Sequence, residues 1–261
     1  MILFLTLMEV ISASNSGTQL DYSSQNHWGG VCTTGAAQSP INVPDPSSNV
    51  SVDSTTPFLS LPQNIVKMTN MNNANTMKYS VNPTGSYAKV PWMNNRMATL
   101  VQLHIHWGEP GARGSEHIIG GKAFAAEAHL VTSYTDSDGS TKYMVFARVF
   151  KLGDANNQVE QMLQGEATAG AARDIAQFDL SALYPSNAIK WVTYMGGLTT
   201  PPCSEIVHWV IVNKPLTISQ NQLNRLRTTP LGNGNLHPMS RNWRNSQPLN
   251  GRQSTGYSRV M

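Results

Sequence analysis

The segment Ala98–Trp107 alternates apolar and polar residues, and this pattern constrains the fold more than any other feature of the chain. Successive side chains of a β-strand point to opposite faces of a sheet. The alternation therefore predicts a half-buried strand whose apolar side carries Val101, Leu103, Ile105 and Trp107. Its polar side carries Gln102, His104 and His106, so the two imidazoles are expected to stand next to each other.

Most of the remaining structural signals are also of the strand type. Runs rich in β-branched and aromatic residues occur at Ala125–Val131, Tyr143–Phe150 and Ile206–Val212. The best helical candidates are Gln158–Ala172 and Ser219–Arg227, and the Pro- and Ser-rich stretch Pro40–Pro62 is typical of a loop. No repeat or linker divides the chain. We predict a mainly β (α+β minor) single domain around a large, mostly antiparallel twisted central sheet with short peripheral helices.

A third histidine completes a candidate metal site. His129 lies in the next strand-like run, and a neighbouring strand is only ~5 Å away, so this ring can reach the same ion as His104 and His106. Three imidazoles without thiolates suit zinc and leave a fourth position open for water. Gln102 and Glu127 each precede a histidine by two residues, and an imidazole that binds a metal needs a partner for its other nitrogen.

The alternative interpretation is that these histidines are structural or surface residues, which is the commoner role of a pair on a β face. Four polar residues on otherwise apolar strands would, however, be costly to bury without partners. A metal site accounts for Gln102, Glu127 and the histidines together.

Composition narrows the choice of partners and compartment. The net charge is +3 and only 13% of residues are charged, which argues against nucleic acid as a partner. No later apolar run approaches the ~20 residues of a membrane helix, so no membrane span is expected.

Residues 1–14 resemble a signal peptide, with a buried strand or an incomplete N-terminus as alternatives. Asn49 begins a glycosylation sequon. In a cytosolic protein Cys32 and Cys203 would be two unrelated buried thiols, and in a secreted one they suggest a single disulfide.

Several motifs together resemble the α-class carbonic anhydrases over roughly Tyr22 to Arg252. They are QLHIHWG at 102–108, GSEH at 114–117, AEAHLV at 126–131, GLTTPP at 197–202, QSPIN at 38–42, NWR at 242–244 and QPL at 247–249. The resemblance implies a zinc enzyme that interconverts carbon dioxide and bicarbonate, with residues 15–261 as its catalytic domain. Cys32 and Cys203 occupy the positions of the disulfide in secreted members, which favours a secreted, extracellular protein.

The resemblance also assigns roles to individual residues. His104, His106 and His129 correspond to the ligands of one Zn2+, with Gln102, Glu127 and the carbonyl of Asn242 holding their outer nitrogens. Thr199 corresponds to the residue that accepts a hydrogen bond from zinc-bound hydroxide, and Glu116 to the carboxylate that orients it. His117 is expected to be structural. The substrate pocket is expected to contain Val131, Val145, Leu198, Thr200, Val207 and Trp209.

One position departs from the faster members of the family. Asn75 stands where they carry a histidine that shuttles protons, and asparagine does not titrate near neutrality. We therefore expect turnover limited by proton transfer. The rival functions are a zinc hydrolase acting on esters and a non-catalytic binding or matrix protein. The presence of all three histidines disfavours the second, because such relatives usually lose one or more of them.

Overall fold

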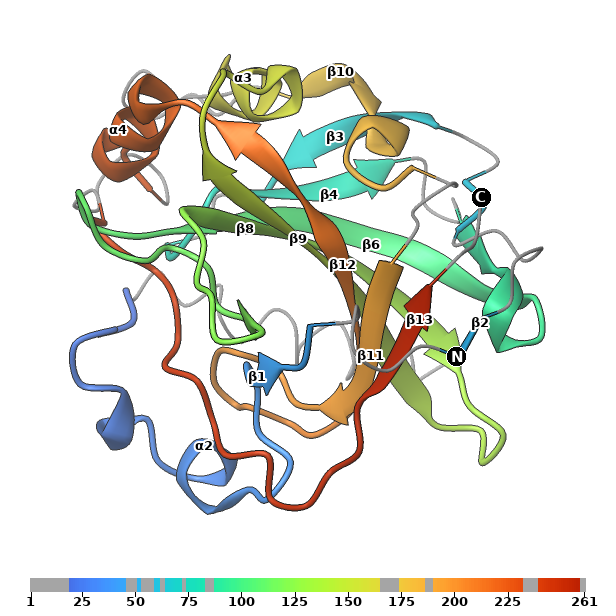
Figure 1. Cartoon of the computed structure of the whole chain (residues 1–261). Helices are drawn as coiled ribbons and strands as arrows, with labels where there is room; N and C mark the ends of the chain where they lie inside the picture. Colours follow the sequence, from blue (N-terminus) through green and yellow to red (C-terminus); the bar gives the residue numbers. More distant parts are fainter. Residues whose placement is uncertain are drawn as a thin grey trace.

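The computed structural model describes residues 19–45, 51–52, 59–61, 64–71, 74–82, 87–164, 174–185, 190–231 and 239–258. The predicted signal peptide (1–14) and the sequon residue Asn49 lie outside these ranges. Within them, eleven strands form one twisted sheet (Figure 1). Its order is β10 (Ile175–Asp179), β3 (Ile65–Asn70), β4 (Lys78–Asn82), β6 (Arg96–Trp107), β8 (Ala126–Thr135), β9 (Thr141–Leu152), β12 (Val207–Ile218), β11 (Lys190–Gly196), β13 (Thr255–Ser258) and β2 (Ser51–Val52), and β5 (Tyr87–Val90) also pairs with β6.

The large central sheet confirms the predicted fold class, but the sheet is mixed. Most neighbours are antiparallel, whereas β9 pairs with β12 and β13 with β2 in parallel. A separate two-stranded sheet joins β1 (Asn42–Val43) to β7 (Ile118–Ile119), also in parallel. Parallel neighbours need a long crossover connection, which the chain between Leu152 and Val207 supplies. The Pro40–Pro62 stretch, expected to be loop, thus contributes the two short strands β1 and β2.

The helices are short and lie outside the sheet, as predicted. α3 (Asn157–Gln164) and α4 (Gln220–Thr228) sit side by side at one edge of the molecule in Figure 1. A capping box between Ser219 and Gln222 starts α4. The remaining helical segments are α2 (Val31–Thr34) and the 3₁₀ turns η2 (Gln25–His27), η3 (Pro91–Met93) and η4 (Leu180–Ala182). The predicted extension of α3 to Ala172 falls outside the described residues. None of the described helices is long and apolar enough to cross a membrane.

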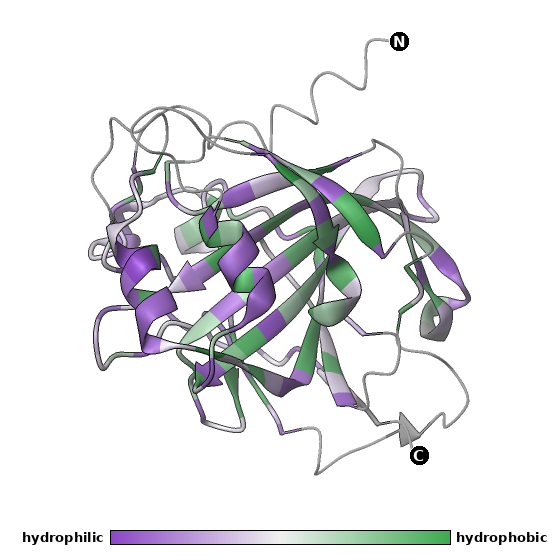
Figure 2. Ribbon diagram, turned by 90° about the horizontal axis from the view of Figure 1, so that it is seen from above, coloured by the Kyte–Doolittle hydropathy of each residue, from purple (hydrophilic) through white to green (hydrophobic). Residues whose placement is uncertain are grey.

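The sheet buries apolar side chains on both of its faces, and Figure 2 shows hydrophobic and hydrophilic residues alternating along its strands. One cluster contains Leu103, Ile105 and Trp107 and includes the buried apolar residues of α3 and α4. The other contains Val131, Val145, Val207, Trp209 and Ile211. The candidate site lies on the second face.

A β-bulge in β6 corrects one expectation. Leu100 pairs with Thr132 and Gln102 pairs with Val131, so Val101 is an extra residue in β6. Leu100 therefore joins Leu103 in the first cluster, whereas Val101 packs against the second. The sequence pattern had placed Val101 on the same side as Leu103. Strict alternation fails there because a bulge changes which face the following residues occupy.

Candidate metal centre

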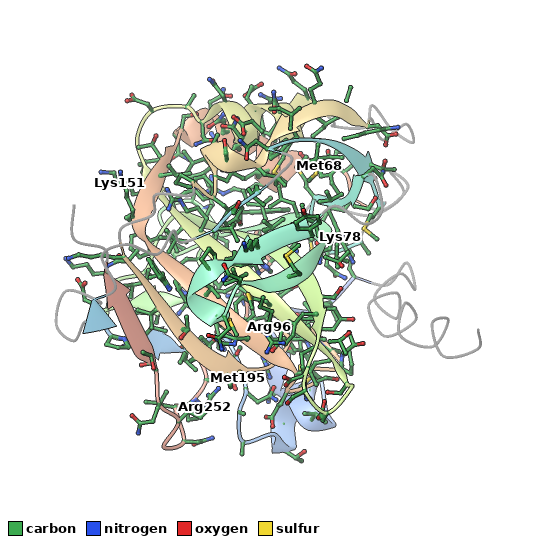
Figure 3. The ribbon with its side chains drawn as sticks, turned by 90° about the vertical axis from the view of Figure 1, so that its right-hand side faces the viewer. Met68, Lys78, Arg96, Lys151, Met195 and Arg252 are labelled. Carbon is green, nitrogen blue, oxygen red and sulfur yellow. A yellow bond between two sulfur atoms is a disulfide. The ribbon has the colours of Figure 1, made fainter. Side chains whose placement is uncertain are left out.

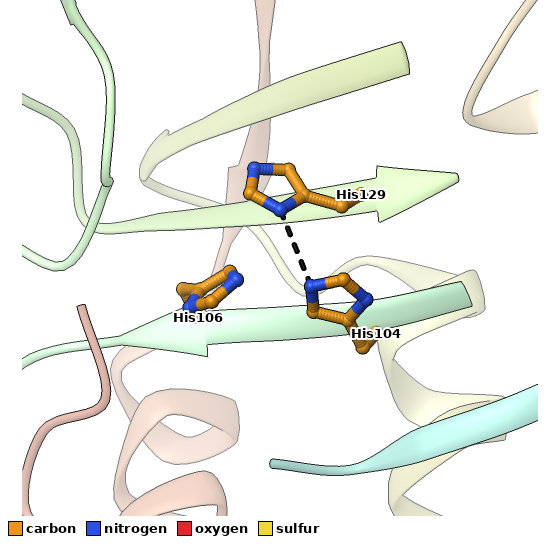
Figure 4. Close-up of side chains that lie close together, drawn as sticks. All are labelled: His104, His106 and His129. Carbon is orange, nitrogen blue, oxygen red and sulfur yellow. Dashed lines mark hydrogen bonds between the residues drawn. The ribbon is translucent and has the colours of Figure 1, made fainter. Parts of the chain in front are cut away.

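Three histidine side chains meet above the β6–β8 ladder. His104 lies directly opposite His129 in the antiparallel register, and His106 follows His104 on the same face. The centroids of the three rings lie 4.7 to 5.0 Å apart. Figure 4 shows the rings converging from the two strands, with His104 Nε2 only 3.2 Å from His129 Nδ1. The i, i+2 spacing on one strand and one residue on its neighbour produce this arrangement.

These nitrogens fit the dimensions of a zinc site. Zinc–nitrogen bonds of about 2.0–2.1 Å in a tetrahedral centre place two ligand nitrogens about 3.3–3.4 Å apart. The 3.2 Å separation between His104 and His129 is close to that value. His106 Nε2 is buried and has no hydrogen-bond partner, which is costly unless another group binds it. The donor set is thus suited to one tetrahedral ion.

The outer nitrogen of each ring is held by an oxygen atom. His104 Nδ1 lies 2.8 Å from Gln102 Oε1, His106 Nδ1 lies 2.7 Å from the carbonyl oxygen of Asn242, and His129 Nε2 lies 2.9 Å from Glu127 Oε1. Carbonyl and carboxylate oxygens only accept hydrogen bonds, so the ring N–H groups donate to them. The lone pairs of His104 Nε2, His106 Nε2 and His129 Nδ1 are then left facing one another.

Burial favours the neutral form of His104 and His129 that a metal requires. It lowers the pKa of His104 well below its usual value, and the neighbouring His106, His129 and Lys78 lower it further. Burial also lowers the pKa of His129, against the opposing influence of Glu127. For Glu127 burial alone raises the pKa, but His117 and His129 outweigh it and hold this pKa well below its ordinary value. Glu127 is therefore a carboxylate at neutral pH.

Behind His129 a hydrogen-bonded chain anchors the site to the sheet. Glu127 Oε1 also lies 2.6 Å from His117 Nδ1, and His117 Nε2 lies 2.7 Å from the hydroxyl of Tyr194. Tyr194 in turn donates to Ser39 Oγ at 2.9 Å. His117, Glu127 and His129 form a second group close enough to hold a metal ion. Because these atoms already bond to one another, the three-histidine group is the better candidate. Sequence reasoning did not identify Tyr194 or Ser39 as part of this chain.

A cavity opens beside His104 and His129. Of the residues predicted for the site, Gln102, Val131, Val145, Leu198, Thr199, Thr200 and Trp209 line it. Val207 does not, and is buried in the apolar cluster beneath. Three further lining residues were missed: Lys78, Tyr143 and Pro201. Tyr143 could have been found from the alternation of β9, because it precedes Val145 by two residues. Lys78 could not, because no strand was predicted over β4.

The predicted hydrogen bond from Thr199 to Glu116 is absent. Glu116 is fully buried, and its Oε1 accepts from the main-chain N–H of Arg244 at 2.8 Å. Its Oε2 has no hydrogen-bond partner and lies 3.5 Å from His106 Nε2 and 4.0 Å from His129 Nδ1. The Oε2 atom thus lies beside the imidazoles and accepts no hydrogen bond from Thr199. Both residues remain at the site, since Thr199 lines the cavity.

Asn75 is tied to the N-terminal segment. It is buried, and its Oδ1 accepts from the main-chain N–H of Leu20 at 2.6 Å. Its carbonyl oxygen accepts from Asn242 Nδ2 at 3.0 Å. Asn75 is not among the lining residues of the cavity. Asn75 therefore connects Leu20, through its side chain, with Asn242, through its main chain, and the carbonyl oxygen of Asn242 is the partner of His106.

A disulfide joins Cys32 in α2 to Cys203, 171 residues later. Cys203 immediately follows the GLTTPP segment that carries Thr199 and Thr200. The carbonyl oxygen of Cys203 accepts from Gln38 Nε2 at 3.1 Å, and Arg244 Nη2 donates to the carbonyl oxygen of Cys32. The bridge therefore attaches the loop beside the cavity to the N-terminal part of the fold.

The fold and site define a class: a β-sheet protein with a group of three histidines that could hold a metal ion, beside a partly apolar cavity. Comparison with known families is consistent with this, since the eukaryotic-type carbonic anhydrase family matches residues 23–256. The chain belongs to that family.

Individual relatives match over a shorter stretch. A putative carbonic anhydrase 3 of Caenorhabditis elegans is 37% identical over 155 residues, covering 59% of this chain and 62% of that protein. Carbonic anhydrase 3 of Equus caballus is 36% identical over 165 residues, and that of Homo sapiens 34% over 168 residues; each match covers 59% of this chain and 63% of the relative. The chain thus spans about three fifths of the length of these curated relatives.

Proposed function

We propose that this protein catalyses the reversible hydration of carbon dioxide to bicarbonate and a proton, with one zinc ion held by His104, His106 and His129. The observation that carries the proposal is the convergence of three imidazoles whose outer nitrogens are all hydrogen-bonded. The family match supports the reaction. A zinc ion held in this way supplies Lewis acidity that makes a water molecule nucleophilic near neutral pH.

The cavity residues have the chemistry that this reaction needs. Val131, Val145, Leu198 and Trp209 offer an apolar wall, which suits a substrate without charge. Thr199 and Thr200 bring hydroxyl groups to the same cavity and can hydrogen-bond to the reacting oxygen atoms. Glu116 Oε2 offers an unpartnered acceptor beside His106. Its hydrogen bond to Thr199 belongs to the proposal and is not formed in this structure.

The first test is stopped-flow hydration of carbon dioxide by the purified protein, with its zinc content measured in parallel. We expect activity that a chelator abolishes and added zinc restores. His129→Ala should lose both zinc and activity, because only two imidazoles remain. His27→Ala, which removes an exposed histidine from η2, is the matched control and should keep both. A folded, zinc-loaded protein without activity would favour the non-catalytic alternative.

We also propose that proton transfer limits turnover. Asn75 does not titrate and its side chain is engaged with Leu20, and no histidine other than His104 and His129 lines the cavity among the described residues. Turnover should therefore rise with the concentration of imidazole buffer and stay below the ~10⁶ per second that carbonic anhydrase can reach. Turnover near that ceiling and independent of buffer would contradict this.

Finally, we propose that the protein is secreted, with residues 1–14 as a cleaved signal peptide, 15–261 as the catalytic domain and Asn49 as a glycosylation site. The Cys32–Cys203 disulfide supports export, because disulfides persist in oxidising compartments. Expression in a secreting eukaryotic cell tests all three points. The medium should contain protein with a new N-terminus, and Asn49→Gln should remove a mass increment from it.

A further inference from the structure

Lys78 is a buried cation in the wall of the candidate active-site cavity. It begins β4 and lies directly opposite His104 in the antiparallel β4–β6 register, so both side chains share one face of the sheet. Only 5% of the residue is exposed, although it lines the cavity. Its position on the flank of the molecule is labelled in Figure 3.

The ammonium group of Lys78 has no anionic partner among the residues that the structure describes, and it forms no hydrogen bond with them. The other described residues that line the cavity are amides, alcohols, imidazoles and apolar groups, so Lys78 is the one among them with a formal charge. Neither of the two carboxylates nearest the histidines pairs with Lys78: Glu127 bonds His117 and His129, and Glu116 faces His106.

The ammonium group is largely withdrawn from bulk water and lines the cavity without an anionic partner, so an anion in the cavity would gain a charge-assisted contact with it. A metal ion at the three histidines would strengthen the effect, because an anion beside His104 would then lie between two positive groups. Carbon dioxide, which is uncharged, gains nothing comparable from Lys78. Lys78 therefore favours the binding of bicarbonate, which is an anion, over the binding of carbon dioxide.

We propose that Lys78 is a specificity-determining residue that binds small carboxylate-like anions in this cavity. The identification of bicarbonate as the natural anion rests on the proposed function, whereas anion recognition itself does not require catalysis. Lys78 is expected to raise the affinity for bicarbonate while leaving the affinity for carbon dioxide unchanged.

The charge of Lys78 that favours anion binding should disfavour zinc binding, so the proposal predicts opposite changes in the two affinities. A cation directly opposite His104 in the β4–β6 register repels a divalent ion at the histidines. Removing the charge should therefore weaken anion binding and strengthen zinc binding. A substitution that merely damaged the site would weaken both.

The experiment compares Lys78→Met, which keeps the chain length and removes the charge, with Lys78→Arg, which keeps the charge. Lys89→Met on the exposed face of β5 is the control for the overall change in net charge. Acetate is the anion probe, and its binding to the zinc-loaded protein at pH 7 is followed by broadening of its methyl proton resonance. Zinc affinity is measured separately by competition with a chelator.

We expect Lys78→Met to bind acetate about tenfold more weakly and zinc several-fold more tightly, as unit charges at short range in a partly shielded cavity imply. Lys78→Arg and Lys89→Met should stay within about twofold of the unaltered protein in both measurements. Undiminished acetate binding by Lys78→Met overturns the proposal, and so does a loss of both acetate and zinc affinity. Carbon dioxide hydration by the unaltered protein is assayed alongside: an inactive protein showing the expected pair of changes would refute the proposed function and leave the inference standing.

Discussion

Arg148 and Arg244 are buried to the same extent, with 2% exposure each, yet among the residues that the structure describes only Arg244 finds hydrogen-bond partners for its guanidinium group. Arg244 donates to Gln38 Oε1 and to the carbonyl oxygens of Ser39 and Cys32. Arg148 points into the main core from β9, and its Nε and Nη1 atoms are buried without partners. Burial lowers the pKa of Arg148 to about 10.

Replacing the two arginines should change stability in opposite directions. Arg148→Met removes an uncompensated buried charge from an apolar environment, so the free energy of unfolding should increase by about 1–4 kcal/mol. Arg244→Met leaves several buried acceptors unsatisfied, so the free energy of unfolding should decrease by about 3–5 kcal/mol. Urea unfolding of the two variants measures both values. A loss of stability in Arg148→Met would show that its charge is compensated in solution.

Glu127→Gln tests the electrostatic support behind the metal site. The amide keeps the size of the side chain but not the charge that His117 and His129 stabilise. Because groups that hold a ligating imidazole typically contribute 10- to 100-fold to metal affinity, zinc binding should weaken by about that factor. Chelator competition provides the measurement, with circular dichroism as a check on folding. Unchanged zinc affinity would mean that Glu127 only positions the ring.

His208 is expected to make stability depend on pH. It lies on β12, and burial, followed by the charge of Arg96, lowers its pKa to about 4, with Asp136 acting in the opposite direction. The unfolded chain takes up a proton near pH 6.5 and the folded chain only near pH 4, so stability falls as the pH drops through this window. This pKa shift corresponds to a loss of at most about 3 kcal/mol in the free energy of unfolding.

The variant His208→Gln isolates this contribution from the other histidines. Between pH 7 and pH 4.5 the metal-free unaltered protein should lose more stability than the variant does, as measured by urea unfolding at both pH values. Equal losses in the two proteins would contradict the assignment.

The disulfide should contribute a large part of the stability. Its 171-residue separation closes a long loop, and on the chain-entropy model such a bridge contributes about 5 kcal/mol. The double variant Cys32→Ser, Cys203→Ser should therefore unfold at a much lower urea concentration. Zinc stoichiometry of the folded variant should be unchanged, because neither sulfur touches the histidines. A variant as stable as the parent would show that the native contacts alone hold the Cys203 loop.

The three histidines illustrate what could be predicted from local sequence. The i, i+2 spacing of His104 and His106 places two imidazoles on one face of any strand. Their position next to each other on β6 could therefore be predicted without knowledge of the tertiary structure. The strand carrying His129 was also predictable from its apolar, β-branched composition. The bulge at Val101 was not, because a bulge depends on the pairing with β8 rather than on the residue itself.

The sequence by itself determined the mainly β fold, the three histidines and the polar residues two positions before two of them, because strand periodicity is a local property of the chain. Only the tertiary structure decided that Lys78 stands opposite His104, that Glu116 Oε2 lies beside His106 and accepts no hydrogen bond from Thr199, and that Asn75 holds Leu20. Those relationships depend on which strands and loops become neighbours, and strand pairing between distant segments is set by the packing of the whole chain.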